Sequence, residues 1–228
     1  MPCCGDGVYQ SSMAPQDDIL GLSPKELRIL LPLKTPIQIQ NYLDKLPMNH
    51  EKKGETHHSV RASLREKKAH CIEGALIAAA ALWLHNEEPL ILDLVSKKGV
   101  GDDGHVIALY KRNGYWGALS KTNHATIRFR DPVYKSVREL ALSYFHEWFM
   151  NANGKKTLRS YSEPLNLKKF GTSWITSEKD LWWLDHELNM LTHFPIAPSK
   201  NMRLLRRADR MEMKAGRFIE WSTKNTRT

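Results

Sequence analysis

Three side chains in the middle of this 228-residue sequence have the types and order of a cysteine-dependent catalytic group: Cys71, His105 and Asn123. A thiolate is a strong nucleophile, an imidazole can carry the proton, and a side-chain amide can hold the imidazole in one tautomer. Such a group breaks or transfers an amide through a thioester. For this chemistry, the elements that carry the three residues must bring their side chains together.

Cys71 stands at the beginning of an apolar run that continues to Leu84, which is too long for an ordinary strand and predicts a buried helix. If the helix begins near Ala69, its first amides favour a thiolate at Cys71 and can hold an oxyanion. The segment Ser63-Leu64-Arg65-Glu66 has the form of a capping box, which would start the helix earlier and place Cys71 in its interior. We expect a separate short helix over residues 59–67 and a new helix near Ala69.

His105 is predicted to open a strand, because a Gly- and Asp-rich loop precedes it and the apolar run 106–110 follows. Asn113-Gly114 then predicts a tight hairpin turn. With these two residues as the turn, the antiparallel register places His105 opposite Thr122, one residue before Asn123. A one-residue bulge would bring Asn123 beside the imidazole.

Other residues could complete the group. Asp131, near the end of a third strand expected over residues 125–130, is the second choice after Asn123. Ser120 and His124 lie on or just after the returning strand, and Asp102 and Asp103 are loop acids that could line a cleft instead. Turn-forming roles for Asn123 and Asp131, and a purely structural role for a buried Cys71, remain the non-catalytic alternatives.

The segments around these residues, 69–75, 104–109 and 114–117, together resemble the transglutaminase-like and papain-like cysteine enzymes. The resemblance covers roughly residues 60–135. It implies an α+β fold in which an antiparallel sheet packs on a central Cys-bearing helix, and acyl transfer or hydrolysis at a protein, peptide or small amide. An aspartate is expected soon after the tryptophan of the second strand, but Ser120 stands four residues after Trp116.

We expect one domain over residues 1–228. Its catalytic core spans about 60–150, with a strand over 90–96, and N-terminal helices lie within about 20–58. A C-terminal helical elaboration occupies about 155–228. Further helices are expected over residues 24–33, 35–46, 136–150 and 177–191.

Composition limits the classes of function. With 41% apolar residues the chain can bury a core, and no run is long enough for a membrane span. Three cysteines do not make a disulfide framework, and Cys3 and Cys4 in the polar start are expected to be non-catalytic. With no signal-peptide pattern, we expect a cytoplasmic protein with reduced thiols. No paired ligand motif indicates a metal, and no cofactor is expected.

The net charge of +9 has one visible concentration, a series of basic residues at three- and four-residue steps that would form one stripe on a helix: Lys200, Arg203, Arg206, Arg207, Arg210, Lys214 and Arg217. This stripe supports a rival hypothesis, an inactive protein of the same fold that contacts nucleic acid or an anionic surface. Nucleic acid is the less favoured partner, because no finger, ribonucleoprotein or phosphate-loop motif accompanies the stripe.

Overall fold

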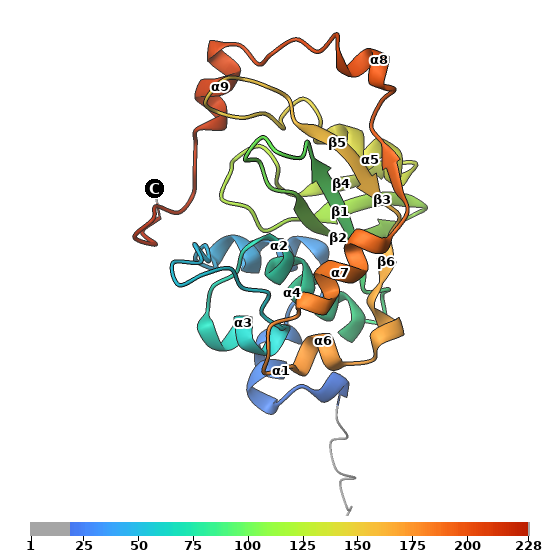
Figure 1. Cartoon of the computed structure of the whole chain (residues 1–228). Helices are drawn as coiled ribbons and strands as arrows, with labels where there is room; N and C mark the ends of the chain where they lie inside the picture. Colours follow the sequence, from blue (N-terminus) through green and yellow to red (C-terminus); the bar gives the residue numbers. More distant parts are fainter. Residues whose placement is uncertain (1–18, 228) are drawn as a thin grey trace, which may run out of the picture.

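The computed structural model describes residues 19–227, a mixed α+β structure built on one open antiparallel sheet (Figure 1). The strand order is β4-β3-β2-β1-β5-β7, and β6 pairs with the other end of β1. The strands are β1 (Leu90–Ser96), β2 (His105–Arg112), β3 (Tyr115–Leu119), β4 (Arg130–Tyr134), β5 (Leu158–Ser162), β6 (Leu165–Asn166) and β7 (His193–Pro195).

Helices cover both faces of the sheet. The larger core lies between one face and most of the helices, and the smaller one lies between the other face and α5. Successive residues of β2 alternate between the two cores, as the period of a strand requires. The helices are α1 (Pro24–Leu30), α2 (Pro36–Lys45), α3 (Val60–Glu66), α4 (Cys71–Leu84), α5 (Val137–Ser143), α6 (Ser173–Thr176), α7 (Trp182–Met190), α8 (Ser199–Met202) and α9 (Arg210–Gly216), with short 3₁₀ turns at Ile19–Gly21 and Leu167–Phe170.

Helices α3 and α4 are separate, as expected, with a non-helical segment between them. Lys67 has a left-handed backbone (φ 52°) and ends α3. The next residues run alongside the segment after α2, where Ala69 N–H donates to the Pro47 carbonyl at 3.2 Å. Cys71 is therefore the first residue of α4, where the N–H groups of the first turn have no intrahelical acceptor.

Gly74 lets the first turn of α4 lie against the segment that follows β3. A Cβ at this position would clash with the Cβ of Lys121. Lys121 is itself 1% exposed, and its Nζ donates to the carbonyls of Leu43 (3.0 Å) and Leu46 (2.5 Å) at the end of α2. The close approach brings the beginning of α4 next to the end of the β2–β3 hairpin.

The hairpin register agrees with the prediction, since Arg112 pairs with Tyr115 and Ala108 pairs with Leu119. Strand β3 ends at Leu119, however, and does not continue to Asn123. The third strand, expected over 125–130, instead forms at β4. The segment between them leaves the sheet and folds back on itself, where Ser120 Oγ donates to Ile127 O at 2.8 Å.

The C-terminal half differs more from expectation. The helix expected over residues 136–150 ends early, at Ser143, and forms α5. The helix expected over residues 177–191 begins later, at Trp182, and forms α7. The basic residues predicted to form one stripe do not lie on a single helix. Asp209 caps a new helix by accepting from the N–H groups of Met211 and Glu212, so the basic residues divide between α8, a loop and α9. In the part of the chain from 19 to 227, no helix is both long and apolar enough to cross a membrane.

Candidate active site

A cleft of about 630 Å³ opens where the beginning of α4 meets the beginning of β2. Cys71 and His105 both line it, so the structure brings together the first two residues predicted from the sequence. Loop 97–104, the segment after β3 and α7 supply other parts of the wall. Trp148 closes one side, with its ring 6.0 Å from the His105 ring in an edge-to-face arrangement. The cleft thus surrounds a potential nucleophile.

Cys71 lies between two imidazoles. Burial raises the pKa of the thiol, but side-chain hydrogen bonds from His105 and His70 and their charges outweigh it and hold the pKa well below its usual value. The sulfur lies 3.8 Å from His70 Nδ1. The N-terminus of α4, a 14-residue helix, adds further positive potential. Cys71 is partly exposed to the cleft, so a thiolate there is accessible.

His105 hydrogen-bonds to Ser120, and not to Asn123 or Asp131, the two residues predicted to orient it. His105 Nε2 lies 2.7 Å from Ser120 Oγ, and Ser120 Oγ donates to the Ile127 carbonyl at 2.8 Å. The hydroxyl proton is thereby committed to Ile127, so Ser120 Oγ accepts from Nε2–H, which leaves Nδ1 for Cys71. The residues lie on the same face of the hairpin, diagonally across it, and not directly opposite.

Helix α2 fixes the position of Ser120. Gln40 accepts from Ser120 N–H at 3.0 Å and donates to Ser120 O at 2.9 Å, so both peptide groups of the serine are held by one side chain. Gln40 and Ser120 are both buried. The orienting hydroxyl therefore sits on a fixed backbone, as precise proton transfer requires.

Asn123 lines the cleft but binds a different part of the chain. Its Nδ2 donates to Trp221 O at 2.9 Å, and its Oδ1 accepts from Trp221 N–H at 2.7 Å. These bonds attach the C-terminal segment to the wall of the cleft. Asn123 does not orient His105, because β3 ends before it and the chain turns away from the strand.

The other residues considered as the third catalytic residue or as part of the cleft lie at different positions. Asp131 is exposed on β4, outside the cleft lining. His124 and Asp103 line the cleft. Asp102 does so too, but its carboxylate accepts from Trp148 Nε1 at 3.1 Å and from the hydroxyls of Ser96 and Thr157, so it holds the loop in place. Cys3 and Cys4 lie outside the described residues.

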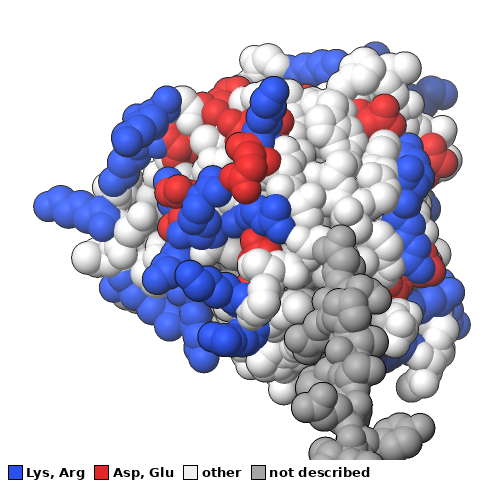
Figure 2. All heavy atoms as spheres, turned by 90° about the horizontal axis from the view of Figure 1, so that it is seen from below, with Lys and Arg blue, Asp and Glu red and all other residues white. Residues whose placement is uncertain are grey.

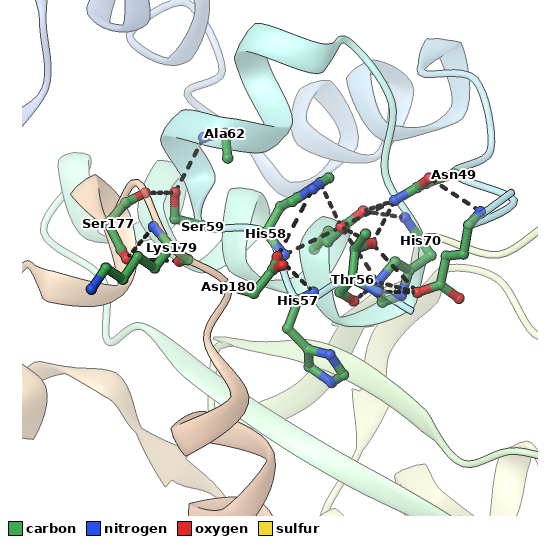
Figure 3. Close-up of polar contacts among 12 residues, drawn as sticks. Asn49, Thr56, His57, His58, Ser59, Ala62, His70, Ser177, Lys179 and Asp180 are labelled. Atoms are coloured by element: carbon green, nitrogen blue, oxygen red, sulfur yellow. Dashed lines mark hydrogen bonds and ion pairs between the residues drawn. The ribbon is translucent and has the colours of Figure 1, made fainter. Parts of the chain in front are cut away.

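The role of His70 was not predicted from the sequence. His70 lies beside Thr56 and Asn49 (Figure 3), and the three residues share one acceptor, the carboxylate of Glu73. Glu73 is fully buried and accepts from His70 N–H at 2.9 Å, Asn49 Nδ2 at 3.1 Å, Thr56 Oγ1 at 3.0 Å and His58 N–H at 3.3 Å. His70 Nε2 lies 2.8 Å from Thr56 O and 3.4 Å from Glu73 Oε1. An acid three residues after the helix cap was the available signal.

These contacts favour a charged His70. Burial lowers its pKa, but the bond to Cys71 and the charges of Cys71 and Glu73 outweigh it and raise the pKa to about 9. Because Nε2 faces a carbonyl, Nε2 carries a proton, and the Nδ1 proton of the charged ring points to the sulfur. The resting site is a thiolate with an imidazolium on one side and His105 on the other.

Removal of the Ser120 hydroxyl tests its orienting role. In Ser120→Ala, the rate of Cys71 alkylation at a pH below the thiol pKa should fall about tenfold, the value of one lost hydrogen bond of about 1.4 kcal/mol. The loss should disappear in a chain that already carries His105→Ala. Thr122→Ala, which removes a buried hydroxyl from the same segment, should leave the rate unchanged. An equal loss in Thr122→Ala would show that the effect is one of packing.

Carboxylates dominate the charged part of the lining: Glu51, Glu55, Asp93, Asp102, Asp103, Glu147 and Asp185. Among residues 19–227, no Lys or Arg lines the cleft. Lys and Arg nevertheless exceed Asp and Glu in the chain and are prominent on its surface, as on the face seen from below in Figure 2. Burial raises the pKa of Asp93, although its bond to His193 opposes this. The cleft therefore combines a thiolate with a negative wall.

A smaller groove has the opposite charge. Arg206 and Arg207, from the predicted stripe, line it together with Lys97, Lys155, Lys156 and Arg159. Arg206 is paired with Asp209 at 2.9 Å and Glu212 at 3.3 Å. Within residues 19–227, no group of three or more His, Cys, Asp or Glu side chains has the arrangement of a metal site.

No protein-family model matches the chain, and no curated protein matches it. The class that the fold and site define is therefore a structural one: a mixed α+β protein with a Cys–His pair where a buried helix meets an antiparallel sheet.

Proposed function

We propose that the protein is a cysteine-dependent amide hydrolase or acyl transferase with a transglutaminase-like fold. The observation that carries the proposal is the position of Cys71: it begins α4, contacts two imidazoles and faces a cleft. A buried structural cysteine needs none of these features. Lowered thiol pKa, a nearby base with a fixed tautomer and access to solvent are the requirements for a nucleophilic thiol.

The residues have defined roles in the proposed reaction. The Cys71 thiolate attacks the carbonyl carbon of an amide, and N–H groups at the beginning of α4 stabilise the oxyanion. His105, which takes the thiol proton at Nδ1 when the thiolate forms, gives this proton to the leaving amine as the C–N bond breaks, which leaves a thioester on Cys71. His105 then takes a proton from water or a second amine, and attack by that molecule releases the acyl group. Ser120 keeps the ring aligned throughout.

His70 distinguishes this site from a simple triad. Its imidazolium stabilises the thiolate before reaction, and it is 9% exposed. Since its other nitrogen is bound to Thr56 O, the ring is fixed and does not need to move during the reaction. We assign it a positioning role, while His105 transfers the proton.

Trapping of the thioester tests the proposed function. The full chain is incubated with a library of N-acetylated peptide amides and acid-quenched, and Cys71 is examined by mass spectrometry. We expect an acyl adduct on Cys71 that hydroxylamine removes and that is absent from Cys71→Ala. If no peptide acylates Cys71, and alkylation of Cys71 is slow and independent of His105, the rival hypothesis of a non-catalytic binding protein with a basic groove replaces this one.

A further inference from the structure

The negative wall of the cleft opposes the nucleophile that it surrounds. A carboxylate near a thiolate destabilises it, and the interaction between Asp93 and Cys71 has this sign. The two histidines keep the thiol pKa low against burial, which is the largest opposing cause, and the charge of Asp93 acts in the same direction as burial. The acidic lining destabilises the thiolate, and it occurs in a chain whose net charge is +9. We therefore infer that the carboxylates of the lining serve to bind a ligand.

Several of the acids are already bound by the protein. Glu51 accepts from Thr56 N–H at 2.7 Å, Glu147 pairs with Arg130 at 2.5 Å, and Asp102 holds the loop before β2. Their charges contribute to the potential, but one oxygen of each carboxylate already accepts from the protein. They form the fixed part of the negative wall.

Other acids have oxygens available to a ligand. Asp103 and Glu55 are exposed, and within the described part of the chain neither carboxylate has a protein hydrogen bond or ion pair. Asp185 is 55% exposed at the side chain; its Oδ2 accepts from Asn189 Nδ2 at 3.1 Å, and its Oδ1, 4.0 Å from His57 Nε2, remains available. The three come from different segments: the loop before His105, the loop that holds His70, and α7. They surround the same cleft from separate sides.

An exposed indole accompanies the acid on α7. Trp182 lines the cleft with 47% of its surface exposed, and it lies three residues before Asp185, on the same side of the helix. Its ring centroid is 4.3 Å from that of His57. A carboxylate beside a half-exposed indole is a combination that binds alkylammonium and guanidinium groups through charge and cation–π attraction.

We propose that the cleft selects substrates with a positively charged side chain, lysine or arginine, close to the amide that Cys71 attacks. This inference rests on the proposed function, because it assigns the substrate class of the same site. Such a group replaces solvent beside Asp103, Asp185 and Trp182 and removes the unfavourable potential at the thiolate. The acids would also draw cationic peptides toward the cleft, and the effect weakens with salt.

The charge selectivity of Cys71 can be measured without a known substrate. The full chain with Cys3→Ser and Cys4→Ser is treated with three methanethiosulfonates: the neutral methyl, the cationic 2-aminoethyl and the anionic 2-sulfonatoethyl reagent. In each case the thiolate forms a mixed disulfide and methanesulfinate leaves. We expect the ratio of cationic to anionic rates, normalised to that of a small free thiol, to exceed about 30 at low salt and to fall toward 1 in high salt.

Matched variants locate the effect. Asp103→Asn and Asp185→Asn should each lower the ratio about threefold, because each removes one charge from the wall. Asp131→Asn removes the same charge from β4, outside the cleft, and should leave the ratio unchanged. An N-acetylated Lys-containing peptide amide should protect Cys71 from the neutral reagent, and the Glu-containing peptide should not.

The outcomes separate this inference from the proposed function. A normalised ratio near 1, or a decrease in Asp131→Asn equal to that in Asp103→Asn, overturns charge selection. That result can coexist with fast, His105-dependent reaction of the neutral reagent, which upholds the nucleophile. Slow, His105-independent reaction of the neutral reagent overturns the proposed function, whatever the ratio is.

Discussion

Alkylation of Cys71 by iodoacetamide at pH 6 should be about 100-fold slower in His105→Ala than in the parent chain, since a thiol returned toward its free pKa of about 8.5 is almost fully protonated there. In the parent chain the pKa lies well below its usual value, so the thiolate persists as the pH falls. With Cys3→Ser and Cys4→Ser in both proteins, the rate–pH profile of His105→Ala should move to higher pH.

The control for His105→Ala is the removal of another histidine that lines the same cleft. His124→Ala removes an imidazole from the segment after β3 and should leave the profile in place, because neither of the two imidazoles hydrogen-bonded to Cys71 is changed. His70→Asn should move the profile upward by a similar amount but preserve more of the turnover, since His105 still transfers the proton. Identical profiles in parent and His105→Ala would remove the basis for an activated thiol.

Glu73→Ala should lower the free energy of unfolding by about 3–5 kcal/mol, the cost of removing one member of a buried polar group whose partners stay behind. Glu73 is fully buried, and its oxygens accept from four residues that belong to two segments. Alanine removes the acceptor of the buried His70 and His58 N–H groups and one acceptor of Asn49 and Thr56. Urea unfolding followed by tryptophan fluorescence measures the loss.

Two variants control this result. Glu66→Ala removes an exposed carboxylate at the end of α3 and should change stability by less than about 0.5 kcal/mol. Glu73→Gln keeps the shape but removes the charge that helps to raise the His70 pKa, so that pKa should fall from about 9. A cost in Glu73→Ala no larger than in Glu66→Ala would mean that the network does not stabilise the fold.

The pH dependence of stability follows from the raised pKa of His70. A group whose pKa is higher in the folded than in the unfolded state stabilises the fold below its unfolded pKa, about 6.5 for histidine. This contribution is lost as the pH rises through about 9. In Glu73→Gln the loss should occur at lower pH, which separates the charge of Glu73 from its hydrogen bonds.

Several features of the site could be predicted from local patterns. The apolar run after Cys71 is too long for a strand, so it indicated α4, and the turn Asn113-Gly114 fixed the register of β2 and β3. The choice of a break before Ala69 over a continuous helix was correct. In each case the pattern lies within about 20 residues, a range in which chain geometry limits the alternatives.

The identity of the orienting residue could not be predicted in this way. The register placed Thr122 and Asn123 near His105, but only if β3 continued, and β3 ends at Leu119. Asn123 lies beyond the end of the strand, and its side chain hydrogen-bonds to the backbone of Trp221, 98 residues away in the sequence. Ser120 was among the alternatives, but its two hydrogen bonds depend on the path of the chain after the strand.

The sequence by itself determined that a cysteine begins a buried helix, that a histidine begins a strand, and that the two belong to a mixed α+β structure. Helix starts and hairpin registers depend on residues close in the chain, and periodicity reveals them. The tertiary structure alone decided that Ser120 orients His105, that Glu73 holds His70 against Cys71, and that carboxylates from several segments meet in one cleft. Those contacts join side chains far apart in sequence, and only the packing of the segments brings them within hydrogen-bonding distance.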